Sequence, residues 1–252
     1  MPTRVIAVAN QKGGVAKTTT VHTLGAALSE RGRRVLLVDL DPQACLTFSV
    51  GISPDELDRS LHDVLLGRAK AHEVLMKAGD ISVLPSNIDL AGAEVHLLSK
   101  TGREYVLARA LAPLLPSYDL VLIDCPPSLG ILTINGLTAA REVLVPLQCE
   151  TLSHRGVGQL LETIEDVRAY TNPDLCVRGV IAAMYDSRTK LAQQVIEDVP
   201  ANYGLRVLDP PVPKSVKVAE APSHGRSILE HAPRSKGANA YRALANTILH
   251  PH

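Results

Sequence analysis

The sequence of 252 residues predicts an α/β fold, a doubly wound and mostly parallel sheet flanked by helices. Short apolar runs alternate with longer helical stretches along the whole chain. These runs contain few polar residues, which is typical of strands that are covered on both faces. Polar residues directly follow several of the runs, at the edge where sheets of this kind bind ligands. We therefore expect one domain that spans residues 1–252.

The elements follow from the spacing of apolar residues. Strands are expected at 5–9, 34–39, 81–84, 120–124, 143–147, 179–184 and 206–208. Helices are expected at 17–31, 89–99, 103–115, 131–140, 152–170, 191–203 and 235–249. Connections between parallel strands are almost always right-handed, so this alternation predicts a doubly wound sheet. The prolines at 210, 211 and 213 indicate a stiff local turn and not a domain boundary.

The composition excludes several classes of protein. Lys and Arg together number 26, as do Asp and Glu, so any DNA contact needs a local basic patch. Four scattered cysteines without a C-x-x-C pair are typical of reduced thiols. The chain starts almost at once with an apolar strand, and no apolar run approaches the roughly 20 residues of a membrane-spanning helix. We expect a cytoplasmic protein with no membrane partner.

A glycine-containing turn, NQKGGVAKTTT at residues 10–20, joins the first strand to the first helix. In that context it predicts a phosphate-binding loop. The backbone N–H groups of Gly13 through Thr19, with Gly14, Val15 and Ala16 between them, can point at phosphate oxygens. Lys17 would reach the terminal phosphates, and the Thr18 hydroxyl would bind Mg²⁺.

This loop departs from the usual pattern G-x-x-x-x-G-K-[ST]. Anchored on Lys17 and Thr18, that pattern requires glycine where the chain has Gln11 and Ala16. We expect Ala16 to be tolerated with a negative φ. A second lysine, Lys12, stands near the entrance of the loop.

Three aspartates end predicted strands near this loop. Asp39 and Asp41 follow the strand at 34–39, and Asp124 ends the strand at 120–124. Carboxylates beside a triphosphate hold the waters around Mg²⁺ or orient the attacking water. A single aspartate at a strand end is usually a cap or turn former, but three beside a phosphate loop favour the functional interpretation.

Several ordered motifs resemble the deviant Walker A ATPases, and within them the ParA/Soj partition proteins. These motifs are KGGVAKTTT, VLLVDLDPQ and LVLIDCPPSLGILTINGLTAA, followed by VLVPLQCE and AEAPSHGRSI, so the resemblance covers essentially the whole chain. It implies a P-loop NTPase fold, ATP and Mg²⁺ as ligands, and slow hydrolysis to ADP and phosphate. It also implies an ATP-dependent homodimer with two nucleotides between the chains.

The resemblance assigns a role to each site residue. Lys12 would contact the nucleotide of the partner chain, and Lys17 that of its own chain. Thr18 would bind Mg²⁺ directly, with Asp39 and Asp124 behind it. Asp41 would position the hydrolytic water.

Two parts of the site are less regular. Met184 and the backbone near Pro213 would hold the base. Ala44-Cys45 replaces the Gly-Asn that relatives tend to have after the DPQ motif, so we expect this switch segment to respond differently in this chain.

A mildly basic region occupies the C-terminal third, where ten Lys and Arg stand against six Asp and Glu between residues 178 and 252. Arg188 and Lys217 match basic positions with which ParA/Soj relatives hold DNA, and Lys214 is close to them. Contacts of this kind go to phosphate and do not depend on sequence. The resemblance therefore implies nonspecific double-stranded DNA and a ParB-type protein as partners, at the nucleoid.

Two other functions remain open. A membrane-cycling relative similar to MinD needs a basic amphipathic helix with bulky apolar residues, whereas YRALANTILHPH has one arginine and no Phe or Trp. A metabolic ATP-dependent ligase on the same fold needs a second substrate pocket, which the sequence does not identify. The cargo, be it a chromosome, a plasmid or another assembly, is not specified by any motif.

Overall fold

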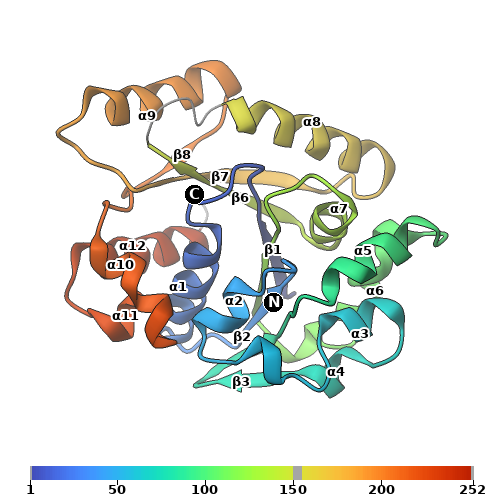
Figure 1. Cartoon of the computed structure of the whole chain (residues 1–252). Coiled ribbons are helices and arrows are strands. Elements are labelled where there is room, and N and C mark those ends of the chain that lie inside the picture. Colours follow the sequence, from blue (N-terminus) through green and yellow to red (C-terminus); the bar gives the residue numbers. More distant parts are fainter. Residues whose placement is uncertain (1, 150–154, 251–252) are drawn as a thin grey trace.

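The computed structural model describes residues 2–149 and 155–250, and its centre is a single sheet of eight strands (Figure 1). The strand order is β3-β4-β2-β5-β1-β6-β7-β8, with every pairing parallel except that of β3 with β4. The strands are β1 (Arg4–Val8), β2 (Val35–Asp39), β3 (Met76–Ala78), β4 (Ile81–Leu84), β5 (Leu120–Asp124), β6 (Glu142–Gln148), β7 (Cys176–Ala183) and β8 (Val207–Leu208). The predicted fold class is confirmed.

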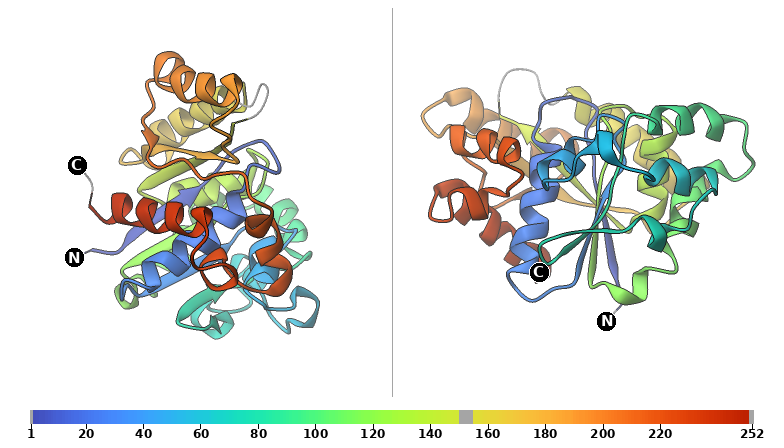
Figure 2. Two further views of the ribbon diagram at one scale, coloured as in Figure 1. Left: turned by 90° about the vertical axis from the view of Figure 1, so that its left-hand side faces the viewer. Right: turned by 60° about the horizontal axis from the view of Figure 1, so that its bottom comes forward.

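Helices cover both faces of this sheet, as the two further views show (Figure 2). One face carries α1 (Lys17–Ser29), α2 (Cys45–Ser49), α11 (Ile228–His231) and α12 (Lys236–Leu249). The other carries α3 (Leu61–Leu66), α4 (Ala71–Val74), α5 (Leu90–Leu98), α6 (Val106–Leu111), α7 (Ile131–Ala139), α8 (Arg155–Tyr170) and α9 (Lys190–Tyr203). A short helix, α10 (Val216–Glu220), precedes α11.

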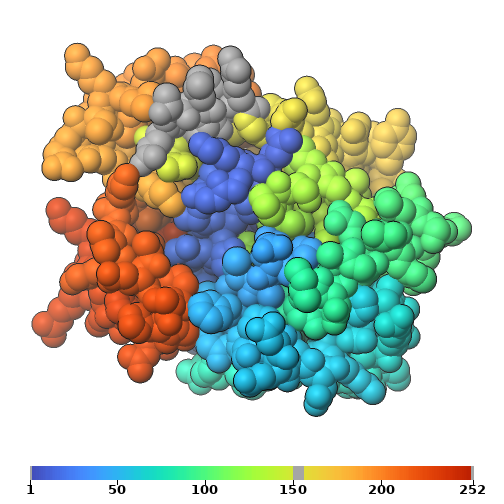
Figure 3. All heavy atoms as spheres, in the orientation of Figure 1, coloured from blue at the N-terminus to red at the C-terminus, as the bar shows by residue number. Residues whose placement is uncertain are grey.

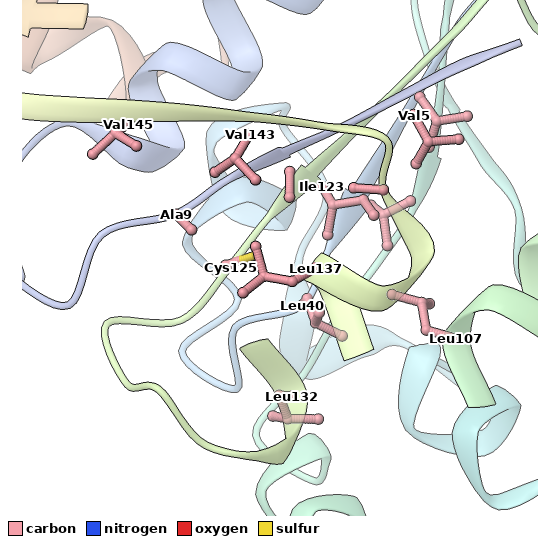
Figure 4. Packing of buried hydrophobic residues seen from close by; sticks show 14 of the residues in the cluster. Val5, Ala9, Leu40, Leu107, Ile123, Cys125, Leu132, Leu137, Val143 and Val145 are labelled. Atoms are coloured by element: carbon pink, nitrogen blue, oxygen red, sulfur yellow. The ribbon is translucent and has the colours of Figure 1, made fainter. Parts of the chain in front are cut away.

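The two faces have separate cores because side chains along a strand alternate between them. In β1, Val5 and Ala7 belong to one buried cluster, while Ile6 and Val8 belong to the other. Figure 4 shows part of the first cluster, where side chains from β1, β5, β6 and α7 gather. At Gly136 of α7 the approach is close, since a Cβ there would lie 2.9 Å from Cys125 Sγ.

The seven predicted strands are all present, with ends shifted by a few residues. The edge strand β3 was not predicted, nor were the short helices α2, α3, α4, α10 and α11, because segments of three to six residues show too little periodicity. The single helix predicted at 103–115 is wrong. It divides into a 3₁₀ turn (Arg103–Tyr105), α6 and a second 3₁₀ turn (Leu115–Ser117), and prolines at 113 and 116 prevent a continuous helix.

The start of the helix expected at 152, and Glu150 of the motif VLVPLQCE, lie outside the described residues. The four cysteines are free thiols, as expected. Among the helices of the described ranges, none has the length and apolar character needed to cross a membrane.

Candidate nucleotide-binding site

The predicted phosphate loop lies between β1 and α1, at the carboxyl edge of the sheet. Asn10 fixes the start of the loop by two hydrogen bonds. The residue is 1% exposed, its Nδ2 donates to Pro146 O (2.7 Å), and its Oδ1 accepts from Lys12 N (3.0 Å). Asn10 was not predicted as a residue of the site, although its position as a polar residue directly after a buried strand could have indicated this role. In Figure 3 the blue atoms, which belong to the N-terminal part of the chain that includes this loop, reach the surface at the centre of the molecule. The loop is therefore accessible to a ligand.

Two residues of the loop have left-handed backbone conformations. Gly14 has φ +73°, whereas Gly13 is not in this region. Ala16 has φ +65° and ψ +31°, so the expected negative φ is wrong. The turn into α1 requires this conformation, which explains why the usual pattern has glycine at the position. Ala16 occupies it at a cost on the order of 1 kcal/mol.

The first backbone N–H groups of α1 donate to no main-chain oxygen within the described residues. Ala16 is the N-cap and provides no side-chain hydrogen bond, and Thr20 N is the first amide of the helix to donate to a main-chain oxygen, that of Ala16 (2.9 Å). Such unpaired N–H groups, together with the helix dipole, form an anion site.

The two lysines of the loop are in different positions. Lys17 is only 7% exposed, and its Nζ donates to the backbone oxygen of Lys12 (3.0 Å). Burial lowers the pKa of Lys17, against the opposing effect of Asp124 and Asp41. Lys12 is exposed. One ammonium group is thus held inside the loop and the other lies on its outer surface.

The predicted metal residues meet because their strands are neighbours. Asp39 and Asp124 are directly paired in the register of β2 and β5, and Asp124 pairs with Val8 of β1. Thr18 Oγ1 donates to Asp124 Oδ2 (2.6 Å). The second carboxylate oxygen, Oδ1, is buried without a hydrogen-bond partner among the described residues. Burial and the nearby Asp39 raise the pKa of Asp124 well above its usual value.

An orphaned carboxylate oxygen beside a threonine hydroxyl suits a hydrated divalent cation. Among the described residues no group of three or more His, Cys, Asp or Glu side chains could hold a metal ion by itself. Mg²⁺ keeps several waters and takes few protein ligands beside substrate phosphates, so the Thr18 hydroxyl and the orphaned Asp124 oxygen are ligands of the right kind. The residues therefore fit the predicted ion.

Asp39 has a structural partner that the sequence analysis missed. Its Oδ2 accepts from both N and Oγ1 of Thr47, each at 2.7 Å, and its Oδ1 accepts from Asp41 N (3.2 Å). Thr47 Oγ1 in turn accepts from Ser86 N, and Ser86 Oγ donates to Asp41 O (both 2.9 Å). Burial raises the pKa of Asp39 to about 6, although the Thr47 hydrogen bonds oppose the change. The main chain of Asp41 is thus held on both sides.

The family was established by comparison with known proteins. Residues 3–177 match the family model described as "AAA domain". The sporulation initiation inhibitor protein Soj of Bacillus subtilis is 44% identical over 247 residues, covering 97% of this chain and 98% of Soj. The chromosome partitioning protein ParA of Caulobacter vibrioides is 44% identical over 252 residues, covering 98% and 94%.

The chain belongs to the ParA/Soj family of P-loop ATPases.

Solved structures place this ParA/Soj member among nucleotide-binding folds. A protein of Mycobacterium smegmatis named cobyrinic acid a,c-diamide synthase, with bound ADP and magnesium, is 57% identical, with a TM-score of 0.89 over 98% of this chain and 94% of that one. The cell division ATPase MinD of Pyrococcus furiosus is 27% identical, with a TM-score of 0.77 over 98% of both chains.

The residues expected at the base and at DNA lie further along the same edge. Met184 follows β7 with φ +53°, and Tyr185 forms a parallel bridge with Pro213. Because β1, β6 and β7 are parallel neighbours, the residues after β7 and the phosphate loop after β1 share the carboxyl edge of the sheet. The side-chain arrangement of a base pocket was not predictable from the sequence.

Arg188 has an acidic partner that was not expected. Its side chain is 87% exposed, and the guanidinium forms a fork with Asp186, with distances of 2.9 Å from Nε and 2.7 Å from Nη2. The hydrogen bonds from Arg188 lower the pKa of Asp186 to about 2. Lys214 N donates to Tyr185 O (3.0 Å), and Lys217 is exposed on α10. The three basic positions thus lie on two segments that the bridge between Tyr185 and Pro213 brings together.

Proposed function

We propose that this ParA/Soj member is an ATP-dependent switch for DNA segregation. The ATP-bound chain forms a sandwich dimer that binds double-stranded DNA without sequence preference. Slow hydrolysis of ATP, stimulated by a ParB-type protein, releases the DNA, and repeated cycles in the cytoplasm move or position a chromosome or plasmid at the nucleoid. The separation of the two lysines carries the proposal: Lys17 is held in the loop by the backbone oxygen of Lys12, while the side chain of Lys12 is exposed.

The loop supplies the binding energy for the phosphates. The negative charge of the phosphates would be bound by the Lys17 ammonium and by main-chain N–H groups of the loop, those of Gly13, Gly14, Val15 and Thr19. Thr18 would hold Mg²⁺ directly, and Asp39 and Asp124 would orient its waters. The ion supplies charge neutralisation between the phosphates.

Asp41 and Lys12 complete the site. Asp41 is half-exposed, its main chain is fixed by Asp39 and Ser86, and its carboxylate can position an attacking water. Lys12 adds a positive charge to the partner's nucleotide only in the dimer, as an arginine finger does. Met184 and Pro213 would contact the base from the end of β7.

DNA binding is proposed for Arg188, Lys214 and Lys217. A phosphate that binds the Nε and Nη2 side of Arg188 must displace Asp186, and an exposed ion pair of this kind contributes little to stability. A dimer doubles the number of phosphate contacts, so weak binding by one chain becomes useful binding by two.

The test is the anisotropy of a labelled nonspecific duplex with no nucleotide, with ADP and with ATP–Mg²⁺, at two salt concentrations. We expect binding only with ATP, weakened by salt, retained in Asp41→Ala and lost in Arg188→Ala. Asp186→Asn should bind DNA more tightly than wild type, and Arg33→Ala, which removes an exposed arginine elsewhere, should be unchanged. ATP-dependent dimers that ignore DNA at low salt would contradict the proposal.

A ligase function is the second candidate, because the M. smegmatis relative is named as a synthase. An amide-forming ligase needs a pocket for its acid substrate beside the phosphates. Two cavities in the described part of the chain, of about 830 and 300 Å³, contain no residue of the phosphate loop in their walls. If the chain is a switch and not a ligase, adding cobyrinic acid and an ammonium salt should leave the rate of ATP hydrolysis unchanged, and stimulation would favour the ligase.

A MinD-like membrane cycle receives less support. The apolar side of α12 packs against α1, and Tyr241 Oη lies 3.1 Å from Thr20 Oγ1. Arg242 forms an ion pair with Glu30, the C-cap of α1. A helix bound in this way has no free apolar face for lipid. We expect no sedimentation of the chain with anionic vesicles in the presence of ATP.

A further inference from the structure

A groove between α3, α4 and α6 lies away from the nucleotide site, and its cavity volume is about 830 Å³. Four exposed cations, Arg68, Lys70, Lys100 and Arg109, stand on its rim. We call this feature the α3–α6 groove. In Figure 1 its helices lie on the right side of the molecule, opposite α9 and α10 on the left.

These four cations have no acidic partner within ion-pair distance among the described residues. The side chains of two of them lie against aromatic rings, those of His62 and Tyr105. Arg68 Nη1 lies 3.4 Å from His62 Nε2, and Arg109 Cζ lies 5.9 Å from the centre of the Tyr105 ring. Their charges therefore face solvent in a chain whose net charge is zero.

The single carboxylate in the wall of the groove is engaged elsewhere. Glu73 Oε2 accepts from Lys70 N (2.9 Å) and lies 3.8 Å from Arg59 Nη1, which is outside the groove wall. These contacts, the Lys70 amide first, lower the pKa of Glu73. One carboxylate thus stands against four cations, and the groove keeps an excess of positive charge.

The floor of the groove is apolar. Its accessible part includes the half-buried Ala69, Val106 and Ala110 and the exposed Pro113, whereas Leu65 and Leu114 are buried in the core. A duplex would present phosphates to the rim but nothing apolar to this floor. An amphipathic helix with acidic residues beside an apolar stripe would satisfy both.

We propose that the α3–α6 groove is a docking site for an acidic amphipathic helix of a partner protein. Charge complementarity identifies the chemistry of the occupant. Such a helix would bury its apolar stripe on the floor of the groove and pair its carboxylates with the four unpaired cations on the rim. The occupant is distinct from the basic tail expected of a ParB-type protein, which these cations would repel. The proposal does not depend on the switch function, because it requires neither nucleotide nor DNA.

The test uses a fluorescein-labelled synthetic helix of about 18 residues, with leucines on one face and glutamates on the others. Anisotropy is measured on the full chain without nucleotide. We expect a Kd on the order of 10 µM at low salt, weakening as salt rises. Peptides with serine in place of leucine, or lysine in place of glutamate, should not bind.

Variants of the chain locate the binding. Arg68→Gln/Arg109→Gln should weaken it at least about fivefold, whereas Arg33→Gln/Arg234→Gln, with the same change in charge at exposed positions elsewhere, should not. Thermal unfolding checks that both pairs fold. ATP-dependent DNA binding should survive in the first pair, which separates this proposal from the switch.

Equal peptide binding by the two double variants would overturn the proposal, as would equal binding of the serine peptide. Binding of a DNA duplex that is lost in Arg68→Gln/Arg109→Gln would make the groove a nucleic-acid contact and would also overturn it. Self-association lost in the same variant would assign the groove to a second copy of this chain, with the same consequence.

Discussion

Thr47 donates two hydrogen bonds, from its amide and from its hydroxyl, to the same oxygen of Asp39, both at 2.7 Å. The residues are eight positions apart, and the pair joins the start of α2 to the end of β2. Because Thr47 also accepts from Ser86 N, the hydroxyl links β2, α2 and the segment after β4. The loop that carries Asp41 is held between these three elements.

Thr47→Val should therefore destabilise the chain and slow hydrolysis more than it weakens ATP binding. The variant leaves Asp39 with one Thr47 donor and Ser86 N without its acceptor, a loss of about 1–3 kcal/mol. Urea unfolding and single-turnover ATP hydrolysis measure the two effects. Thr163→Val, which removes a hydroxyl bonded only to a helix carbonyl, is the matched control. A normal kcat in folded Thr47→Val would show that the contact does not position Asp41.

The two loop lysines should separate binding from dimerisation. Lys17→Ala should lose about tenfold or more in ATP affinity, because a charged donor to phosphate is removed. Lys12→Ala should bind ATP nearly as wild type but remain a monomer. Fluorescent-nucleotide titration and light scattering report the two properties, with Lys236→Ala as an exposed control. ATP-dependent dimers of Lys12→Ala would remove this residue from the interface.

Ala44 provides a test of backbone strain, since it caps α2 with φ +52° and ψ +30°. Glycine adopts this conformation freely, so the relief of strain in Ala44→Gly should offset the larger entropy of the unfolded chain. We expect its free energy of unfolding to change by less than about 0.5 kcal/mol. Ala26→Gly, inside α1, should lose about 1 kcal/mol. Equal losses in denaturant unfolding would contradict the strain at position 44.

His22 should make stability depend on pH. It is buried on α1, and burial lowers its pKa from 6.5 to about 4, although Glu230 opposes this change. The unfolded state therefore binds the proton more tightly. The contribution of neutral His22 is complete above about pH 6.5 and is lost as the pH falls towards 4, by up to about 3 kcal/mol.

His22→Gln should remove this part of the pH dependence. Urea unfolding at about pH 4.5 and about pH 7.5 measures the difference between wild type and variant. His72→Gln, which removes an exposed imidazole, serves as the control. A difference that is the same at both pH values would rule out His22 as the titrating group.

The residues of the site that lie at the ends of buried strands were predictable from the sequence. Asp39, Asp124 and the loop after Val8 follow buried apolar runs, and parallel strands bring their carboxyl ends to one edge. Nothing local predicted Thr47 or Ser86, because their hydrogen bonds join segments that are apart in the chain. The conformation of Ala16 was mispredicted because alanine rarely takes a positive φ, and only the surrounding turn imposes it.

The amino-acid sequence by itself determined the doubly wound sheet, the phosphate loop and the aspartates beside it, since periodicity and residue type are local properties. Only the tertiary structure decided that Thr47 and Ser86 hold the segment that carries Asp39 and Asp41, and that four cations surround the α3–α6 groove. These relationships depend on the packing of segments that are apart in the chain, which local pattern does not determine.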